Sequence, residues 1–112
     1  MRRIFWAALA VSVISTATSA ETDPKTVKTW KAKCASCHGA DGKATTETGT
    51  KLGIPDFTTA AWQKKVDDAT MKKSISDGVV RPGKTEGMDP YKEKLDGAQI
   101  DALIAYIRTF GK

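Results

Sequence analysis

The 112-residue chain has only two cysteines and one histidine, and it lacks an apolar run long enough to cross a membrane. Three such ligands are one fewer than a structural zinc site normally uses. A convincing strand alternation, an internal repeat and a sustained heptad are absent as well. The formal charge is only +5, and no block of lysine and arginine of the nucleic-acid-binding type occurs, so we expect no nucleic-acid partner.

The first 20 residues have the composition of a secretory signal peptide. Arg2 and Arg3 precede the apolar stretch 4–17, and small residues lead to Ala20. The stretch is shorter than the roughly 20 residues that a membrane span needs. We expect cleavage after Ala20, a periplasmic location and a mature domain of residues 21–112 without a membrane span. An uncleaved anchor that tethers the same domain to a membrane is the alternative.

The mature chain opens with a predicted helix. Asp23 is a good N-cap, and Pro24 suits the first helical position. Apolar residues and both cysteines then recur at three- and four-residue spacing as far as Cys37, so the cysteines face the interior. Residues 39–53, rich in Gly, Thr and Lys, predict an irregular loop that GIPDF, residues 53–57, closes with a proline turn.

Two short helices are expected next. Thr58 or Thr59 can cap the first, and Asp67 can cap the second, which should end at Gly78. The segment 79–94 contains Pro and Gly every few positions and is not expected to form a long regular element.

The last helix has the clearest signals. Asp96 and Gln99 form a capping-box pattern, and Gly111 ends the helix. Its apolar stripe comprises Ile100, Leu103, Ile104, Ile107 and Phe110. The sequence therefore predicts an all-α domain with loops as long as its helices.

The pentapeptide CASCH, residues 34–38, contains both cysteines and the only histidine. C-x-x-C-H is the attachment signal of c-type haem, in which Cys34 and Cys37 add to the two vinyl groups and His38 binds the iron. A covalent haem would also supply the core that so small a domain needs. A dithiol exchanger is disfavoured because a helix, not a strand, precedes the motif. A disulfide would close a very small loop and stabilise little.

Three segments, CASCHGADGK, GIPDF and GMDPYKEKLDGAQIDALIAYIRTFGK, resemble the small bacterial class I cytochromes c. The resemblance covers nearly the whole mature chain. It implies about four helices wrapped around one covalent haem c, with the N- and C-terminal helices crossing near one edge. It also implies that Met88 is the second axial ligand, although the family's usual Met-Pro is Met-Asp-Pro here.

The residues themselves favour the same methionine. Met1 leaves with the signal peptide, and Met71 lies at helical spacing with Ile75, which indicates a core role. Met88 lies in a Gly/Pro-rich loop that can bring its sulfur to a metal, although packing alone is the alternative.

The resemblance assigns three further residues. The carbonyl of Pro55 would accept a hydrogen bond from the second imidazole nitrogen of His38. Trp62 would donate its indole N–H to a haem propionate, with simple burial as an equal alternative. Trp30 would pack against the last helix, where Tyr106 or Phe110 could meet it.

Iron held by His and Met has no open position, so we expect a one-electron carrier, not an enzyme. Two alternatives stay open: a haem enzyme or a peroxide or gas sensor with an open axial site, and a dedicated electron-transfer subunit of a periplasmic dehydrogenase. We expect a monomer that docks weakly on redox partner proteins through lysines around the haem edge, unless these are merely solvated. These lysines are Lys28, Lys31, Lys33, Lys43 and Lys51.

Overall fold

The computed structural model of the chain describes residues 10–12 and 22–112. The predicted signal peptide, residues 1–20, lies outside these residues except for 10–12, so its cleavage stays a prediction. Among the described residues, no helix has both the length and the apolar character that crossing a bilayer requires.

The cysteine-bearing helix begins where the sequence predicted. The Asp23 side chain accepts a hydrogen bond from the backbone N–H of Lys25, 3.0 Å away, and caps α1 (Pro24–Thr29). The chain then continues through a π-helical turn, η1 (Trp30–Cys34), into α2 (Ala35–His38). The sequence did not predict the π turn, which is a feature often found beside functional sites.

The predicted loop after the motif contains a helix, α3 (Glu47–Leu52), so that part of the prediction was wrong. Thr46 caps it by accepting a hydrogen bond from Gly49 N–H at 2.9 Å, and the same hydroxyl donates to the carbonyl of Cys37. Gly53 ends the helix in the left-handed region, with φ of 65°.

The two helices that follow confirm their predicted caps. Thr59 caps α4 (Ala60–Lys65), and Asp67 caps α5 (Asp68–Asp77), which ends at Gly78. Both cap side chains accept from the backbone N–H three residues later.

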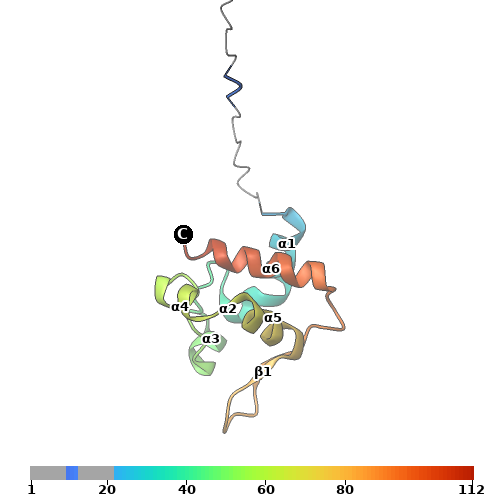
Figure 1. Cartoon of the computed structure of the whole chain (residues 1–112). Helices are drawn as coiled ribbons and strands as arrows, with labels where there is room; N and C mark the ends of the chain where they lie inside the picture. The colour runs from blue at the N-terminus through green and yellow to red at the C-terminus, as the bar shows by residue number, and fades with distance from the viewer. Residues whose placement is uncertain (1–9, 13–21) are drawn as a thin grey trace, which may run out of the picture.

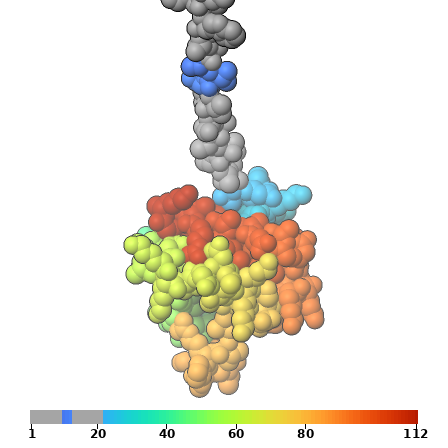
Figure 2. Space-filling view, viewed as in Figure 1, coloured from blue at the N-terminus to red at the C-terminus, as the bar shows by residue number. Residues whose placement is uncertain are grey.

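A small hairpin follows α5 and projects from the body of the molecule (Figures 1 and 2). It pairs β1 (Val79–Val80) with β2 (Gly87–Met88) in antiparallel register, with Val79 opposite Met88. The sequence predicted no strand here, because two paired residues on each side give no readable alternation.

The last helix, α6 (Gly97–Thr109), crosses the body and packs against α1 and α5 (Figure 1). Its predicted capping box is present, with Gln99 N–H donating to Asp96 at 2.8 Å and the Gln99 side chain accepting from Asp96 N–H at 2.9 Å. The buried stripe comprises Ile100, Leu103, Ile104 and Ile107. The regular elements of the described residues are therefore helices apart from one hairpin, which confirms the predicted all-α class.

Trp30 joins the first and last helices, as the resemblance implied. Only 2% of this residue is exposed. Its ring meets Tyr106 edge-on at a centroid distance of 5.7 Å and lies 5.2 Å from Phe110. The N- and C-terminal helices are thus fixed to one another at this aromatic cluster.

Arg108 connects α6 to α4 and α5. Its guanidinium donates to the carbonyls of Gln63 and Val66, at 2.8 and 2.6 Å, and pairs with Asp68 at 2.8 Å. Because α4 and α5 form part of the cavity described below, this contact helps to set the cavity's shape.

Candidate functional site

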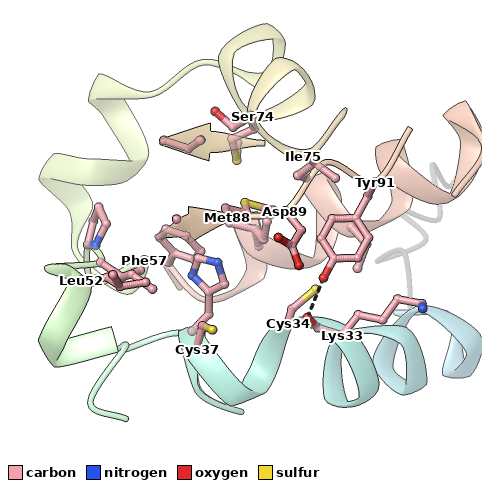
Figure 3. A pocket seen from close by; sticks show the side chains of 18 of the residues that line it. Lys33, Cys34, Cys37, Leu52, Phe57, Ser74, Ile75, Met88, Asp89 and Tyr91 are labelled. Carbon is pink, nitrogen blue, oxygen red and sulfur yellow. Dashed lines mark hydrogen bonds between the residues drawn. The ribbon is translucent and has the colours of Figure 1, made fainter. Parts of the chain in front are cut away.

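A cavity of about 420 Å³ lies between the cysteine-bearing helix, the GIPDF segment, α5, α6 and the hairpin (Figure 3). Its volume falls within the range of ordinary ligand and cofactor sites. Large apolar side chains dominate its wall, among them Phe57, Trp62, Met71, Ile75, Leu103 and Ile107. Met71 is only 5% exposed and belongs to the core cluster, which confirms its predicted core role.

The candidate ligands come together on the wall of this cavity. Cys34, Cys37 and His38 reach it from the end of η1 and from α2, and Met88 reaches it from β2. All four residues are half-buried. In Figure 3 the two cysteines and Met88 lie around one cavity although they belong to distant parts of the chain.

Both cysteines are free, and the environment of Cys34 does not suit disulfide exchange. Burial raises the pKa of the Cys34 thiol to about 11, against the opposing effect of the Lys33 charge. Exchange proceeds through a thiolate, which reactive cysteines stabilise by lowering their pKa. Cys34 is therefore protonated at neutral pH and suited to a role other than redox exchange.

His38 lies between two aromatic rings. Its imidazole stacks on Phe57 with centroids 4.9 Å apart, and it meets Trp30 at 5.7 Å. Burial lowers the pKa of His38, so the ring is neutral at pH 7, as a metal ligand must be. Its Nδ1 is buried and has no hydrogen-bond partner among the described residues. A buried nitrogen without a partner is costly.

The candidate ligands suit a metal that is already bound in a macrocycle. Within residues 10–12 and 22–112, no group of three or more His, Cys, Asp or Glu side chains could hold a metal ion by itself. One imidazole, one thioether and two thiols beside an apolar cavity match the needs of a covalently attached haem. The residues present therefore fit this group.

The two residues that the resemblance added both lie at the cavity, but their roles stay predictions. Pro55 lines the wall, yet Nδ1 of His38 makes no hydrogen bond to its carbonyl. The ring orientation follows instead from the stacking on Phe57. Trp62 is half-buried and packs on Phe57 at a centroid distance of 4.2 Å.

Sequence reasoning missed two contributions to the site. Phe57 supports both His38 and Trp62, and its place in GIPDF was interpreted only as part of a turn. The indole of Trp30 donates to the buried carbonyl of Gly39 at 3.0 Å, which fixes the residue that follows His38. Phe57 lies 19 residues after His38, so no local pattern indicated this contact.

The predicted lysines are exposed, but they are not equivalent. Lys33 lies at the cavity wall, whereas Lys51 pairs with Glu86 at 3.3 Å. Arg81 and Lys84 from the hairpin also line the cavity and were not predicted.

Residues 22–107 match the family model described as cytochrome C oxidase, cbb3-type, subunit III. The chain belongs to this cytochrome c family. The family implies a covalently bound haem c, in agreement with the fit of the cavity residues.

Curated relatives and solved structures agree with this assignment. The chain is 31% identical over 103 residues to the cbb3-type cytochrome c oxidase subunit CcoP of Azospirillum brasilense, covering 92% of this chain and 32% of that protein. It is 36% identical over 80 residues to CcoP of Rhodobacter capsulatus, covering 70% of this chain and 26% of that protein. The chain thus spans about a third or less of the length of these relatives.

Among solved structures, the KustC0563 c-type cytochrome is similar, with a TM-score of 0.69 and 36% identity. The likeness covers 78% of this chain and 98% of that one. A mutant of the same cytochrome gives a TM-score of 0.65. The chain has the predicted all-α cytochrome c fold.

The Trp30–Gly39 hydrogen bond can be tested by substitution in the haem-loaded cytochrome. Trp30→Phe leaves the Gly39 carbonyl buried without its donor, so we expect the free energy of unfolding to fall by about 1–3 kcal/mol, with lost packing in addition. Trp62→Phe is the matched control, since that ring is only half-buried. Chemical denaturation of both variants measures the difference, and equal losses would contradict the assigned role of the hydrogen bond.

Proposed function

We propose that this domain holds one haem c through Cys34 and Cys37, with His38 and Met88 as axial ligands, and that it carries single electrons. The meeting of these four side chains on one apolar cavity is the observation that carries the proposal. Haem iron, when bound, supplies a one-electron couple between its ferrous and ferric forms.

The two thiols act as attachment points. Cys34 and Cys37 would hold the haem through thioether bonds to its two vinyl groups, and because the thiol hydrogen would go to the second vinyl carbon, no external oxidant would be needed. The spacing of Cys34 and Cys37 places both thiols at one wall of the cavity, three residues apart. Attachment at two points then keeps the group from dissociating.

The two axial ligands determine the chemistry. His38 is kept neutral by burial and is therefore available as a donor. As an iron ligand, the thioether of Met88 would raise the reduction potential of the haem relative to a haem with two histidine ligands. Because His38 and Met88 would both bind the iron, oxygen and peroxide would have no free coordination site on it, which favours a carrier over an enzyme.

Such an electron carrier could act as a free protein or as part of a larger complex. The first is a soluble, monomeric periplasmic carrier released by cleavage after Ala20. The second is an electron-transfer subunit or domain of a larger redox complex, and it is favoured by the curated relatives, which are named as oxidase subunits. A dehydrogenase subunit is a variant of the second setting.

Docking would use the positive side chains at the cavity. Lys33, Arg81 and Lys84 lie at its wall and are exposed, whereas Glu86 and Asp89 partly offset their charge. An acidic redox partner would be attracted to this edge without being held tightly.

Replacing Met88 tests the ligand assignment. Met88→Ala should abolish the weak band near the red end of the ferric spectrum, lower the midpoint potential and let carbon monoxide bind the ferrous protein. Met88→His should restore six-coordination but lower the potential strongly, since axial ligands help to tune haem over about 0.8 V. Optical spectra and redox titrations measure both effects.

Met71→Ala is the matched control, because Met71 is a core methionine at the same cavity. It should cost about 2–5 kcal/mol of stability and leave the red band unchanged. The reverse pattern for the two methionines would show that Met88 is not the ligand. A wild-type spectrum without the band would favour the open-site enzyme or sensor.

Ionic strength tests the docking surface. The association rate with an acidic redox partner should fall steeply between low and physiological salt, because mobile ions screen the exposed charges. Lys33→Gln should reduce this dependence, whereas Lys28→Gln, away from the cavity wall, should change it less. A flat salt dependence in stopped-flow measurements would assign these lysines to solvation alone.

A further inference from the structure

Met88 is held on its N-terminal side by the hairpin. Val79 pairs with Met88, and Val80 pairs with Gly87. A Cβ on Gly87 would collide with the carbonyl of Val79, so only glycine allows this close pairing. Gly78, with φ of +77°, lies where a side chain would press on the carbonyl oxygen of Met88. The strand pairing thus fixes the backbone before Met88, and Gly78 packs closely against the backbone of Met88, Asp89 and Pro90.

The C-terminal side of Met88 has weaker local support. Asp89 and Pro90 are both exposed, and the next residue with buried surface is Tyr91. Backbone N–H groups of Tyr91 and Lys92 donate to α5, the latter to the carbonyl of Ser76 at 3.2 Å, and the Tyr91 hydroxyl adds a contact to the cysteine-bearing helix.

Tyr91 makes contacts in two directions. Its backbone N–H donates to the carbonyl of Ile75 at 2.9 Å, which attaches the segment to α5. Its hydroxyl donates to the carbonyl of Lys33 at 3.2 Å, across 58 residues of sequence (Figure 3). Lys33 immediately precedes Cys34, so the hydroxyl reaches the cysteine-bearing helix beside an attachment point.

The Tyr91 ring lies on the cavity wall between these two attachments. Burial raises the pKa of Tyr91 above its ordinary value, and the charge of Asp89 acts in the same direction, so the phenol stays protonated and can donate at neutral pH. The Lys94 ammonium lies 5.4 Å from the ring centroid.

We propose that Tyr91 is the positioning residue for Met88, and that its hydrogen bond to the Lys33 carbonyl keeps the methionine segment closed against the cysteine-bearing helix. The inference rests on the proposed role of Met88 as iron ligand. Without this bond the segment should open more often, because the hairpin and the backbone hydrogen bonds of Tyr91 and Lys92 to α5 would then hold it without the contact to the cysteine-bearing helix. Opening would leave the sixth iron position to an external ligand.

Tyr91→Phe in the haem-loaded protein tests the inference, since it removes the hydroxyl and keeps the ring and the backbone contact. The probe is imidazole, which competes with the methionine sulfur for ferric iron. The apparent affinity of such a probe rises with the fraction of open molecules. Loss of one neutral hydrogen bond predicts imidazole binding about 2- to 12-fold tighter. The red band should also disappear at lower temperature.

Tyr106→Phe is the matched control, because that ring belongs to the aromatic cluster with Trp30. It should leave imidazole affinity unchanged. If Tyr91→Phe lowers global stability without changing imidazole affinity or the red band, Tyr91 is only structural and the inference is wrong. If wild-type protein lacks the band and takes imidazole without competition, the ligand assignment fails, and the positioning role fails with it.

Discussion

The buried hydrogen bond from the Trp30 indole to the Gly39 carbonyl, at 3.0 Å, is the contact on which the site's geometry depends most. Trp30 is simultaneously packed against α6 through Tyr106 and Phe110. One side chain therefore connects the end of the C-x-x-C-H motif to the last helix. The position of His38, between Trp30 and Phe57, follows from this arrangement, and with it the cavity wall that carries both thiols.

Burial then determines the protonation states of Cys34 and His38 at the cavity. It keeps the Cys34 thiol protonated and the His38 ring neutral, which suits attachment and metal ligation better than thiol exchange. The same apolar wall would exclude water from a bound haem. Met88 comes from a hairpin outside the helical body, so its position relies on backbone pairing with Val79 and on the Tyr91 contact.

The sequence predicted the secondary-structure elements that depend on interactions between residues close in sequence. The caps Thr59, Asp67 and Asp96 act within three residues of themselves, and each was confirmed. The elements it missed depend on distant partners. Thr46 also bonds the carbonyl of Cys37, which no local pattern reveals. The stacking of Phe57 on the histidine likewise depends on the closed fold. The cysteine motif could be identified because its chemistry needs a fixed spacing, whereas the assignments of Pro55 and Trp62 came only from the resemblance.

Mass analysis of the protein, produced from its full chain in a host that matures c-type cytochromes, tests the central claim most directly. The account predicts that intact protein exceeds the mass of its chain by one haem. After proteolysis, that haem should stay on the peptide that contains Cys34 and Cys37, and denaturation in acid should not release it. A peptide with two unmodified thiols, or a haem that acid extracts, would contradict the account.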